Sequence, residues 1–241
     1  MKDFIISPTY NERNNIVALV NAIFSRYPTI NILVVDDNSP DGTADVVRDL
    51  QTKFPNLHLR ERAGKLGLAS AYLESFEYLL ETYPDIRSII TMDADLSHDP
   101  VVIAAMLEAI EHYDLVLGSR YVRGGSIQDW QLWRLLLSRG GNLYARFISG
   151  IPIHDLTTGY QCFSAKLLRN ERFKGIKANG FAFLMELKMF AYSLDAKILE
   201  TPIVFKNRVD GVSKISNRII YEGLIVPWLL RKHLREFRRK K

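Results

Sequence analysis

The chain has 241 residues, of which 47% are hydrophobic and 24% are charged, and its formal net charge is +5. This composition is typical of a globular protein with one sizeable core, and it excludes disordered and collagen-like chains. Cys162 is the only cysteine, so an intramolecular disulfide is excluded and a reducing compartment is expected. Apolar runs such as residues 224–230 are much shorter than the roughly 20 residues of a membrane-spanning helix.

The first half of the chain alternates between strand-like and helix-like segments. Short apolar runs bounded by Pro, Gly or Asp predict strands, and apolar residues three or four positions apart predict helices. In chain order they predict strand 4–8, helix 14–24, strand 30–35, helix 43–50, an edge strand 57–60, helix 68–80, strand 88–92, helix 101–112 and strand 114–118. Such alternation predicts a single Rossmann-like α/β domain, with a mostly parallel sheet and helices on both faces.

Polar residues follow the predicted strands at their carboxyl ends, which is where open parallel sheets bind ligands. Residues 9–12 follow the first strand, 36–38 the second, 93–95 the fourth and 119–121 the fifth. Taken singly, many of these residues could cap the next helix or turn. Their joint placement at successive strand ends is better explained by a nucleotide-diphosphate site.

Asp93 and Asp95 lie two positions apart, directly after a buried strand. Residues with this spacing in an extended chain point the same way, so both carboxylates could bind one hard cation. Mg²⁺ or Mn²⁺ held by one or two carboxylates and by phosphate oxygens is the usual arrangement for a nucleotide diphosphate. An isolated Asp-x-Asp is weak evidence by itself, and the other polar strand ends are what favour the metal site.

No histidine is placed like a general base, and a sugar hydroxyl acceptor would need such a base. A phosphate monoester needs none, because its second pKa lies near 6 and it is already ionised at pH 7. Cations would be needed to position it, and Arg120, Arg134 and Arg139 are the candidates. Residues 130–139 hold too many large apolar side chains for a solvated helix. They fit an interfacial helix at a membrane or, alternatively, a core helix with snorkelling arginines.

The positive charge is concentrated at the C-terminus. Residues 231–241 contain seven Lys or Arg and one Glu, a local charge of +6, which leaves −1 for the rest of the chain. Apolar residues and Trp228 precede these cations, a pattern that favours an anionic membrane surface over nucleic acid. A helix packed on the domain with a frayed end is the alternative. We predict a catalytic domain over residues 1–215 and an amphipathic basic segment over residues 216–241.

Three motifs, at residues 7–16, 34–43 and 93–100, resemble the inverting glycosyltransferases of the large family that includes cellulose and chitin synthases. Later segments are similar to the polyprenyl-phosphate (dolichyl-phosphate) mannosyltransferases: residues 118–121, 130–134, 138–140, 155–159 and 208–214. The resemblance covers about residues 4 to 220. It implies a glycosyltransferase-A fold and an inverting, Mg²⁺- or Mn²⁺-dependent transfer of mannose from GDP-mannose to a polyprenyl phosphate. The expected location is peripheral, at the cytoplasmic face of a membrane.

The resemblance also implies roles for the matching residues. Asp93 and Asp95 would hold the metal ion and, with Arg120, form the catalytic centre. The nucleotide sugar would be bound by Pro8, Tyr10, Glu12, Val35, Asp37, Asp93, Ala94, Asp95, Arg120, Arg208 and Lys214. The acceptor phosphate would be bound by Arg120, Arg134, Ser138 and Arg139.

This chain departs from its relatives at two places. Ser97 stands where relatives often have Gln, which removes a side-chain candidate for a third metal ligand. Some relatives carry C-terminal transmembrane helices or small membrane-anchoring subunits, and such a subunit is therefore a candidate partner here. The donor motifs fit guanine and uracil equally, so a UDP-sugar transferase using glucose or an N-acetyl sugar is an alternative. A nucleotide-sensing membrane module without turnover is another, and nucleic acid is not an expected partner.

Overall fold

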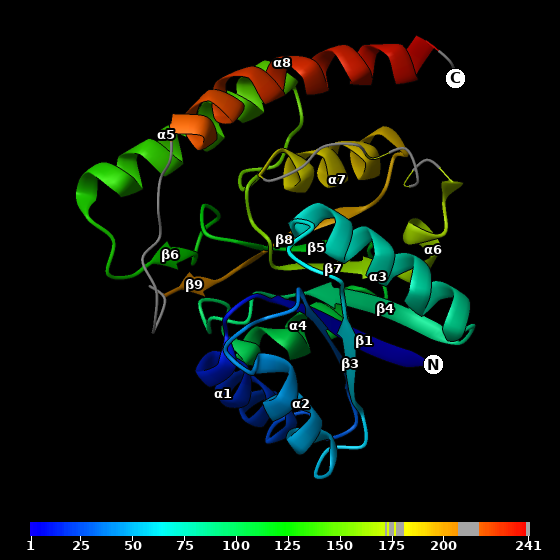
Figure 1. Ribbon diagram of the computed structural model, residues 1–241. Coiled ribbons are helices and arrows are strands. Elements are labelled where there is room, and N and C mark those ends of the chain that lie inside the picture. The colour runs from blue at the N-terminus through cyan, green and yellow to red at the C-terminus, as the bar shows by residue number, and fades with distance from the viewer. Residues whose placement is uncertain (172, 174–175, 177–180, 207–216, 240–241) are drawn as a thin grey trace.

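A mixed β-sheet with helices on both faces forms the body of the molecule in the computed structural model (Figure 1). The structure describes residues 1–171, 173, 176, 181–206 and 217–239. The strands of this sheet are β1 (Lys2–Thr9), β2 (Asn31–Asp36), β3 (Leu57–Glu61), β4 (Ile86–Thr91), β5 (Leu115–Ser119), β7 (Gln161–Ser164) and β8 (Ile198–Pro202). A short ladder pairs β6 (Ser126–Ile127) with β9 (Val204–Phe205).

The helices alternate with these strands as the sequence predicts. They are α1 (Arg13–Phe24), α2 (Thr43–Gln51), α3 (Leu68–Thr82), the 3₁₀ turn η1 (Pro100–Val102), α4 (Ile103–Ala109), α5 (Leu132–Ser149), α6 (Ala165–Leu168), α7 (Phe181–Ser193) and α8 (Asn217–Arg239). The helix predicted over 101–112 is shorter than expected. It opens as the 3₁₀ turn because Asp99 caps Val101 and Pro100 occupies the first turn.

The strand order is β3-β2-β1-β4-β7-β5-β8. The neighbours pair in parallel except around β7, which runs antiparallel to both β4 and β5. The predicted parallel sheet and the edge position of β3 are confirmed. Strands β7 and β8 had no counterpart in the sequence prediction, because β7 is four residues long with polar ends and β8 does not alternate clearly.

Alternate residues of β1 pack into two different hydrophobic cores, because successive side chains of a strand point to opposite faces of the sheet. Phe4 and Ile6 face the core under α3 and α7, whereas Ile5 faces the core shared with α1, α2 and α4. All three side chains have no exposed surface. The strands in the middle of the sheet are therefore buried on both sides, and their polar ends are the part that can meet a ligand.

Helix α8 packs along α5 and α7 at the top of the molecule (Figure 1). Leu230 and Leu234 are buried there, and Trp228 Nε1 donates to Tyr144 Oη at 2.9 Å. Packing on the domain, one of the two interpretations of this segment, is thus observed for these residues. The predicted boundary between residues 215 and 216 lies at the edge of residues 207–216, which are outside the described part. No helix among the described residues is long and apolar enough to cross a membrane.

The packing of α8 can be tested with two leucines on the same helix. Leu234→Ala should lower the free energy of unfolding by about 2–4 kcal/mol, because it leaves a cavity beneath the helix. Leu229 is 48% exposed, so Leu229→Ala should change stability by only about 0.5 kcal/mol. Urea unfolding followed by circular dichroism would measure both. Equal effects from the two substitutions would mean that α8 does not pack as described.

Candidate active site

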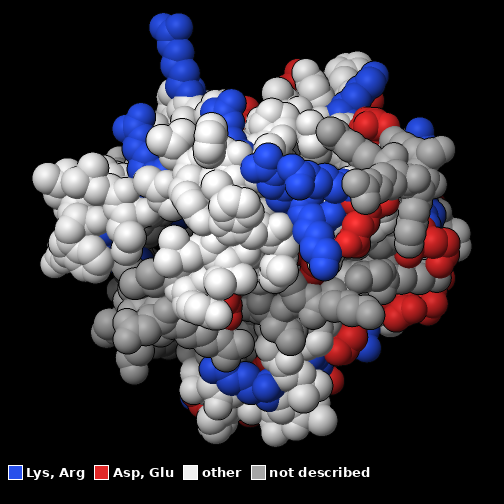
Figure 2. All heavy atoms as spheres, turned by 90° about the horizontal axis from the view of Figure 1, so that it is seen from above, with Lys and Arg blue, Asp and Glu red and all other residues white. Residues whose placement is uncertain are grey.

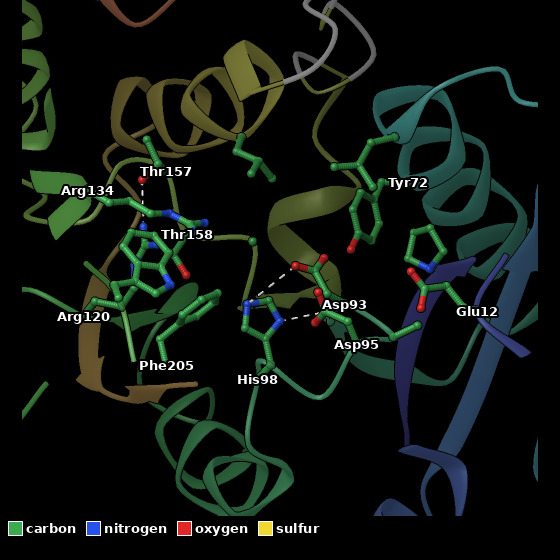
Figure 3. Close-up of a pocket in the computed structure, with 16 residues that line it drawn as sticks. Glu12, Tyr72, Asp93, Asp95, His98, Arg120, Arg134, Thr157, Thr158 and Phe205 are labelled. Atoms are coloured by element: carbon green, nitrogen blue, oxygen red, sulfur yellow. Dashed lines mark hydrogen bonds and ion pairs between the residues drawn. The ribbon is translucent and has the colours of Figure 1, made fainter. Parts of the chain in front are cut away.

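A cleft of about 300 Å³ opens at the carboxyl ends of β1, β4 and β5 (Figure 3). Seven of the residues predicted from the sequence line it: Pro8, Glu12, Asp93, Ala94, Asp95, Arg120 and Arg134. They come from segments up to 126 positions apart along the chain. The parallel strands bring them together because their carboxyl ends share one edge of the sheet.

Other predicted residues lie near this cleft without lining it. Tyr10 is exposed, and Lys65 Nζ lies over its ring, 4.0 Å from the centroid. Val35 is buried within β2 and can offer a ligand little beyond its backbone. Arg139 is exposed on α5, and the Ser138 hydroxyl is bonded to Tyr121 Oη at 2.6 Å. Arg208 and Lys214 lie outside the described residues.

Asp37 is held by an arginine that could not be identified from the sequence. Arg62 Nη1 donates to Asp37 Oδ1 at 2.7 Å, and both side chains are almost fully buried. The same guanidinium also bonds Ser70 and Glu74 on α3. An ion pair so enclosed fixes the carboxylate rigidly at the end of β2. No spacing rule links residue 62 to residue 37, since only the pairing of β2 with β3 makes them neighbours.

The acidic end of the cleft holds Asp93 and Asp95. Asp93 is partly exposed, whereas Asp95 is 3% exposed and accepts the Ser97 N–H on Oδ1 at 3.1 Å. Ser97 itself does not line the cleft. No cluster of three or more His, Cys, Asp or Glu suited to a metal occurs in the described part of the chain. The two carboxylates alone fit a cation that takes its other ligands from water and phosphate, as Mg²⁺ does.

Tyr72 of α3 points at these carboxylates from across the cleft (Figure 3). Its hydroxyl is buried and has no hydrogen-bond partner among the described residues. Burial raises the pKa of Tyr72 well above its usual value, and the charges of Asp93 and Asp95 raise it further. The phenol therefore stays protonated. A buried donor without a partner, beside two carboxylates, fits a site whose polar ligand completes it.

His98 also lines the cleft, a position that the spacing Asp-x-Asp-x-x-His could have suggested. Its Nδ1 accepts the backbone N–H of Asp93 at 3.1 Å, and its Nε2 lies 3.9 Å from Asp93 Oδ2. Burial lowers the pKa of His98, against the opposing charges of Asp93 and Asp95. The neutral ring must then carry its proton on Nε2, facing Asp93. His98 therefore orients Asp93, and its accepting nitrogen is not available to a substrate.

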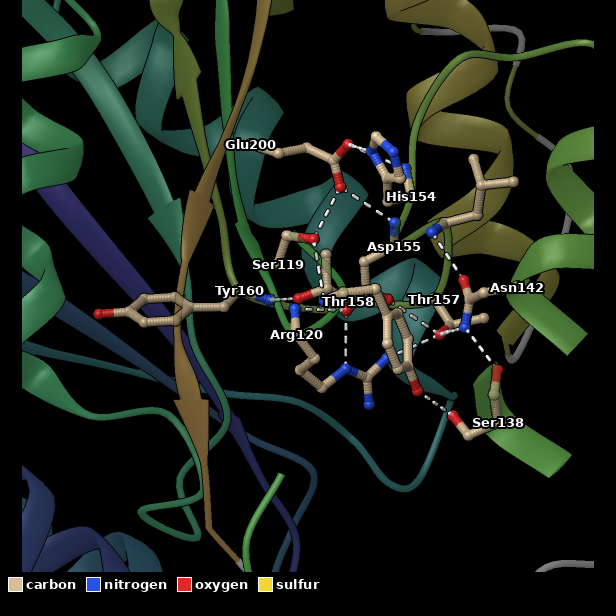
Figure 4. A network of polar contacts seen from close by, with 12 residues as sticks. Ser119, Arg120, Ser138, Asn142, His154, Asp155, Thr157, Thr158, Tyr160 and Glu200 are labelled. Carbon is tan, nitrogen blue, oxygen red and sulfur yellow. Dashed lines mark hydrogen bonds and ion pairs between the residues drawn. The ribbon is translucent and has the colours of Figure 1, made fainter. Parts of the chain in front are cut away.

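Arg120 lies at the opposite, basic end of the cleft (Figure 3), and its polar contacts are shown in Figure 4. Its Nε and Nη2 each donate to Asp155 at 2.7 Å, and Nη2 also donates to Thr157 Oγ1 at 2.8 Å. Burial would raise the pKa of Asp155, but the charge and hydrogen bonds of Arg120 outweigh it and lower that pKa. Asp155 belongs to the segment 155–159 that resembles the mannosyltransferases, and the structure identifies it as the counter-ion of Arg120.

Aromatic side chains enclose the second arginine of this basic end. The Arg134 guanidinium lies over the Trp130 ring, 3.9 Å from the centroid. Trp130 in turn meets Phe205 of β9 edge-on at 5.8 Å. An arginine on an aromatic face keeps its charge at reduced desolvation cost, so it can still bind an anion. One cleft therefore offers carboxylates for a cation at one end and guanidinium groups for an anion at the other.

A buried lysine supports the loop behind this basic end. Lys188 of α7 donates to Thr158 O at 2.8 Å and to Leu184 O at 3.1 Å, and it is completely buried. Glu200 of β8 accepts from Ser119 Oγ at 2.7 Å and from the Asp155 N–H at 3.0 Å (Figure 4). These contacts hold residues 155–159 from below, although neither side chain lines the cleft.

Residues 4–171 match the model of the family described as Glycosyl transferase family 2. The chain is 37% identical over 237 residues to the polyprenol monophosphomannose synthase of Mycolicibacterium smegmatis, covering 97% of this chain and 89% of that protein. It is 36% identical to the undecaprenyl-phosphate mannosyltransferase of Micrococcus luteus, covering 93% of this chain and 92% of that protein.

Solved structures share the fold at lower identity. Glucosyl-3-phosphoglycerate synthase from Mycobacterium tuberculosis, crystallised with Mn²⁺, uridine diphosphate and glucosyl-3-phosphoglycerate, has a TM-score of 0.65 and 16% identity. The match covers 95% of this chain and 79% of that one. The Rossmann-like α/β domain predicted from the sequence is thus a fold already seen in crystal structures.

Lys188 should make the free energy of unfolding depend on pH between about 7 and 10. Burial lowers its pKa to about 7, against the opposing attraction of Asp155, whereas an unfolded chain keeps a lysine pKa near 10.4. Between these values the unfolded state binds more protons, so stability rises with pH. From pH 7 to pH 9 the free energy of unfolding should rise by about 2 kcal/mol more in the wild type than in Lys188→Met.

Urea unfolding at several pH values would measure this difference. Lys53→Met, in the exposed turn that follows α2, is the matched control and should keep the wild-type dependence. Parallel pH profiles for the wild type and Lys188→Met would contradict the assignment of a depressed pKa to Lys188.

Proposed function

The chain belongs to glycosyl transferase family 2, and from that membership we propose that it transfers mannose from GDP-mannose to a polyprenyl phosphate. The transfer inverts the anomeric carbon and depends on Mg²⁺ or Mn²⁺. Two relatives that match nearly the whole chain are named for mannose transfer to prenyl phosphates. The observation that carries the proposal is the separation of charge within one cleft, with carboxylates at one end and arginines at the other.

The donor occupies the acidic end in this proposal. Asp93 and Asp95 would hold the divalent ion, which when bound offsets the negative charge on the departing nucleotide diphosphate. Glu12 and Asp37 stand at the ends of β1 and β2, where base and ribose would be bound, with Asp37 kept rigid by Arg62. Arg208 and Lys214 are the further candidates for binding the diphosphate.

The acceptor phosphate occupies the basic end. Arg120 and Arg134 would position its ionised oxygen, and Ser138 and Arg139 lie on the same helix as Arg134. An oxygen of the acceptor attacks the anomeric carbon from the side opposite the diphosphate, the bond to the diphosphate breaks, and GDP leaves with the electron pair. No proton moves, so no general base is needed. This agrees with the geometry of His98, whose accepting nitrogen is already bonded to Asp93.

A lipid-linked acceptor requires the cleft to stand at a membrane surface. Large apolar side chains are exposed on α5 and α8, among them Leu132, Trp133, Leu136, Phe147, Leu224 and Trp228. Figure 2 views this side and shows uncharged surface with Lys and Arg among it. Apolar side chains next to cations suit the interface of an anionic membrane. We place the protein peripherally on the cytoplasmic face, with or without a small anchoring subunit.

One assay tests the chemistry. Radiolabelled GDP-mannose, UDP-glucose and UDP-N-acetylglucosamine would each be incubated with a polyprenyl phosphate, and label would be extracted into organic solvent. We expect label only from GDP-mannose, lost with EDTA and reduced about 100-fold in Asp95→Asn. Asp49→Asn, on exposed α2 surface, is the matched control. Transfer from a UDP-sugar would show that GDP-mannose is the wrong donor. Full activity without metal would overturn the proposed role of Asp95.

Vesicle binding tests the membrane placement. Lys232 and Arg235 are exposed on α8, and each cation near an anionic surface contributes about 1 kcal/mol. Replacing both by Gln should weaken binding to acidic vesicles roughly 30-fold, and raised salt should act similarly. The control pair Arg26→Gln and Lys53→Gln lies at the far end of the molecule, near α1 and α2 (Figure 1). Sedimentation with vesicles would measure binding, and equal losses in both pairs would contradict the assigned face.

A further inference from the structure

Helix α5 is buried only in its second half. Its buried residues are Asn142, Ala145, Ile148 and Ser149. The first half projects away from the sheet (Figure 1), carries Arg134 into the cleft, and exposes Leu132, Trp133, Leu136 and Leu137. Asn142 is therefore the first buried side chain along this helix, at the point where the projecting half joins the body of the protein.

Two glycines, Gly140 and Gly141, directly precede Asn142, although no neighbouring atom is close enough to require a residue without a side chain there. A Cβ added at Gly140 or Gly141 would meet no atom of the described residues within 4 Å. Each glycine costs an exposed helix about 1 kcal/mol relative to Ala, because it adds backbone freedom. The helix is thus intrinsically weak beside Asn142, and its direction depends on contacts made there.

Both the oxygen and the nitrogen of the Asn142 side-chain amide form hydrogen bonds with the loop of residues 155–159 (Figure 4). Its Oδ1 accepts the Leu156 N–H at 2.9 Å, and its Nδ2 donates to Thr157 Oγ1 at 3.1 Å. Nδ2 also donates to Ser138 O at 3.0 Å, one turn earlier in α5. At 3% exposure the side chain has no access to water as a substitute partner.

These contacts permit only one orientation of the amide. The Thr157 hydroxyl accepts from Arg120 Nη2 and from Asn142 Nδ2, and it donates to Asp155 Oδ1 at 3.2 Å. One donated and two accepted bonds exhaust a hydroxyl. A rotated amide would point its oxygen at the Ser138 carbonyl and its nitrogen at the Leu156 N–H, which is unfavourable on both sides.

A second connection runs parallel to the first. Tyr121 follows Arg120 in the chain, and its hydroxyl is bonded to Ser138 Oγ at 2.6 Å. The Arg120 guanidinium also lies 5.3 Å from the centroid of the Tyr121 ring. Helix α5 therefore touches the environment of Arg120 at two points, with Asn142 on one route and Ser138 on the other.

We infer that Asn142 is a positioning residue for the transfer reaction, because it links the buried half of α5 to the Arg120 guanidinium through the Thr157 hydroxyl. The inference rests on the proposed function, since its effect is on the reacting phosphates. Through this contact the two arginines of the cleft, one on α5 and one after β5, keep a fixed relation to each other. Asn142 touches no substrate itself.

The experiment is a double-mutant cycle on turnover. Asn142→Ala and Thr157→Val each interrupt the connection, and each should lower kcat roughly tenfold or more, because small misplacements of binding groups are costly. The double variant should be no slower than the slower single variant, since both remove one connection. Asn21→Ala is the matched control: Asn21 makes the same bond to the carbonyl four residues earlier, but on the exposed surface of α1.

Other readouts separate positioning from simple stability. Thr157→Ser keeps the hydroxyl and should be more active than Thr157→Val, with both melting at similar temperatures. That pair carries the test if Asn142→Ala does not fold. Losses that multiply in the double variant, or a Thr157→Val kcat equal to that of Thr157→Ser, would overturn the inference. A wild type that transfers none of the sugars offered would instead overturn the proposed function, so the two failures are distinguishable.

Discussion

The buried pair of Arg120 and Asp155 is the interaction on which the rest of the cleft depends. Asp155 has no exposed surface and receives the Arg120 backbone N–H as well as two guanidinium bonds. Removing one partner of such a pair costs about 3–5 kcal/mol, because a charge is left buried without compensation. The pair therefore fixes the loop of residues 155–159 against the end of β5. Thr157 belongs to this loop, and Asn142 and Glu200 form hydrogen bonds with it.

The reversed strand β7 explains why this loop reaches the cleft at all. In a parallel sheet the carboxyl ends of the strands meet at one edge, and the segments before each strand lie at the other. Because β7 runs antiparallel to β4 and β5, its amino end lies at the ligand edge. Residues 155–159 end one residue before β7 and therefore lie beside Asp93 and Arg120. A parallel strand at this position would have carried them to the opposite side of the sheet.

The charge pattern of the cleft and the apolar surface of α5 belong to one arrangement. Arg134 lies on the same helix as the exposed leucines and Trp133, so the helix that would meet a lipid also supplies a cation to the cleft. The carboxylates lie at the end of β4, and His98 contacts one of them. A donor held at the sheet and an acceptor arriving along α5 would then meet between the two ends, each next to groups of opposite charge.

The alternation of strands and helices, and the site residues that follow strands, could be read from the amino-acid sequence alone. Periodicity reports which face of a segment is buried, and Glu12, Asp93, Asp95 and Arg120 come directly after strands whose ends must coincide. The polar pairs between distant segments became visible only in the folded protein. Three such pairs depend on strand order, on the direction of β7 and on how α5 packs against the domain. They are Arg62 with Asp37, Asp155 with Arg120, and Asn142 with Thr157. These are long-range contacts between buried polar groups, and no local spacing encodes them.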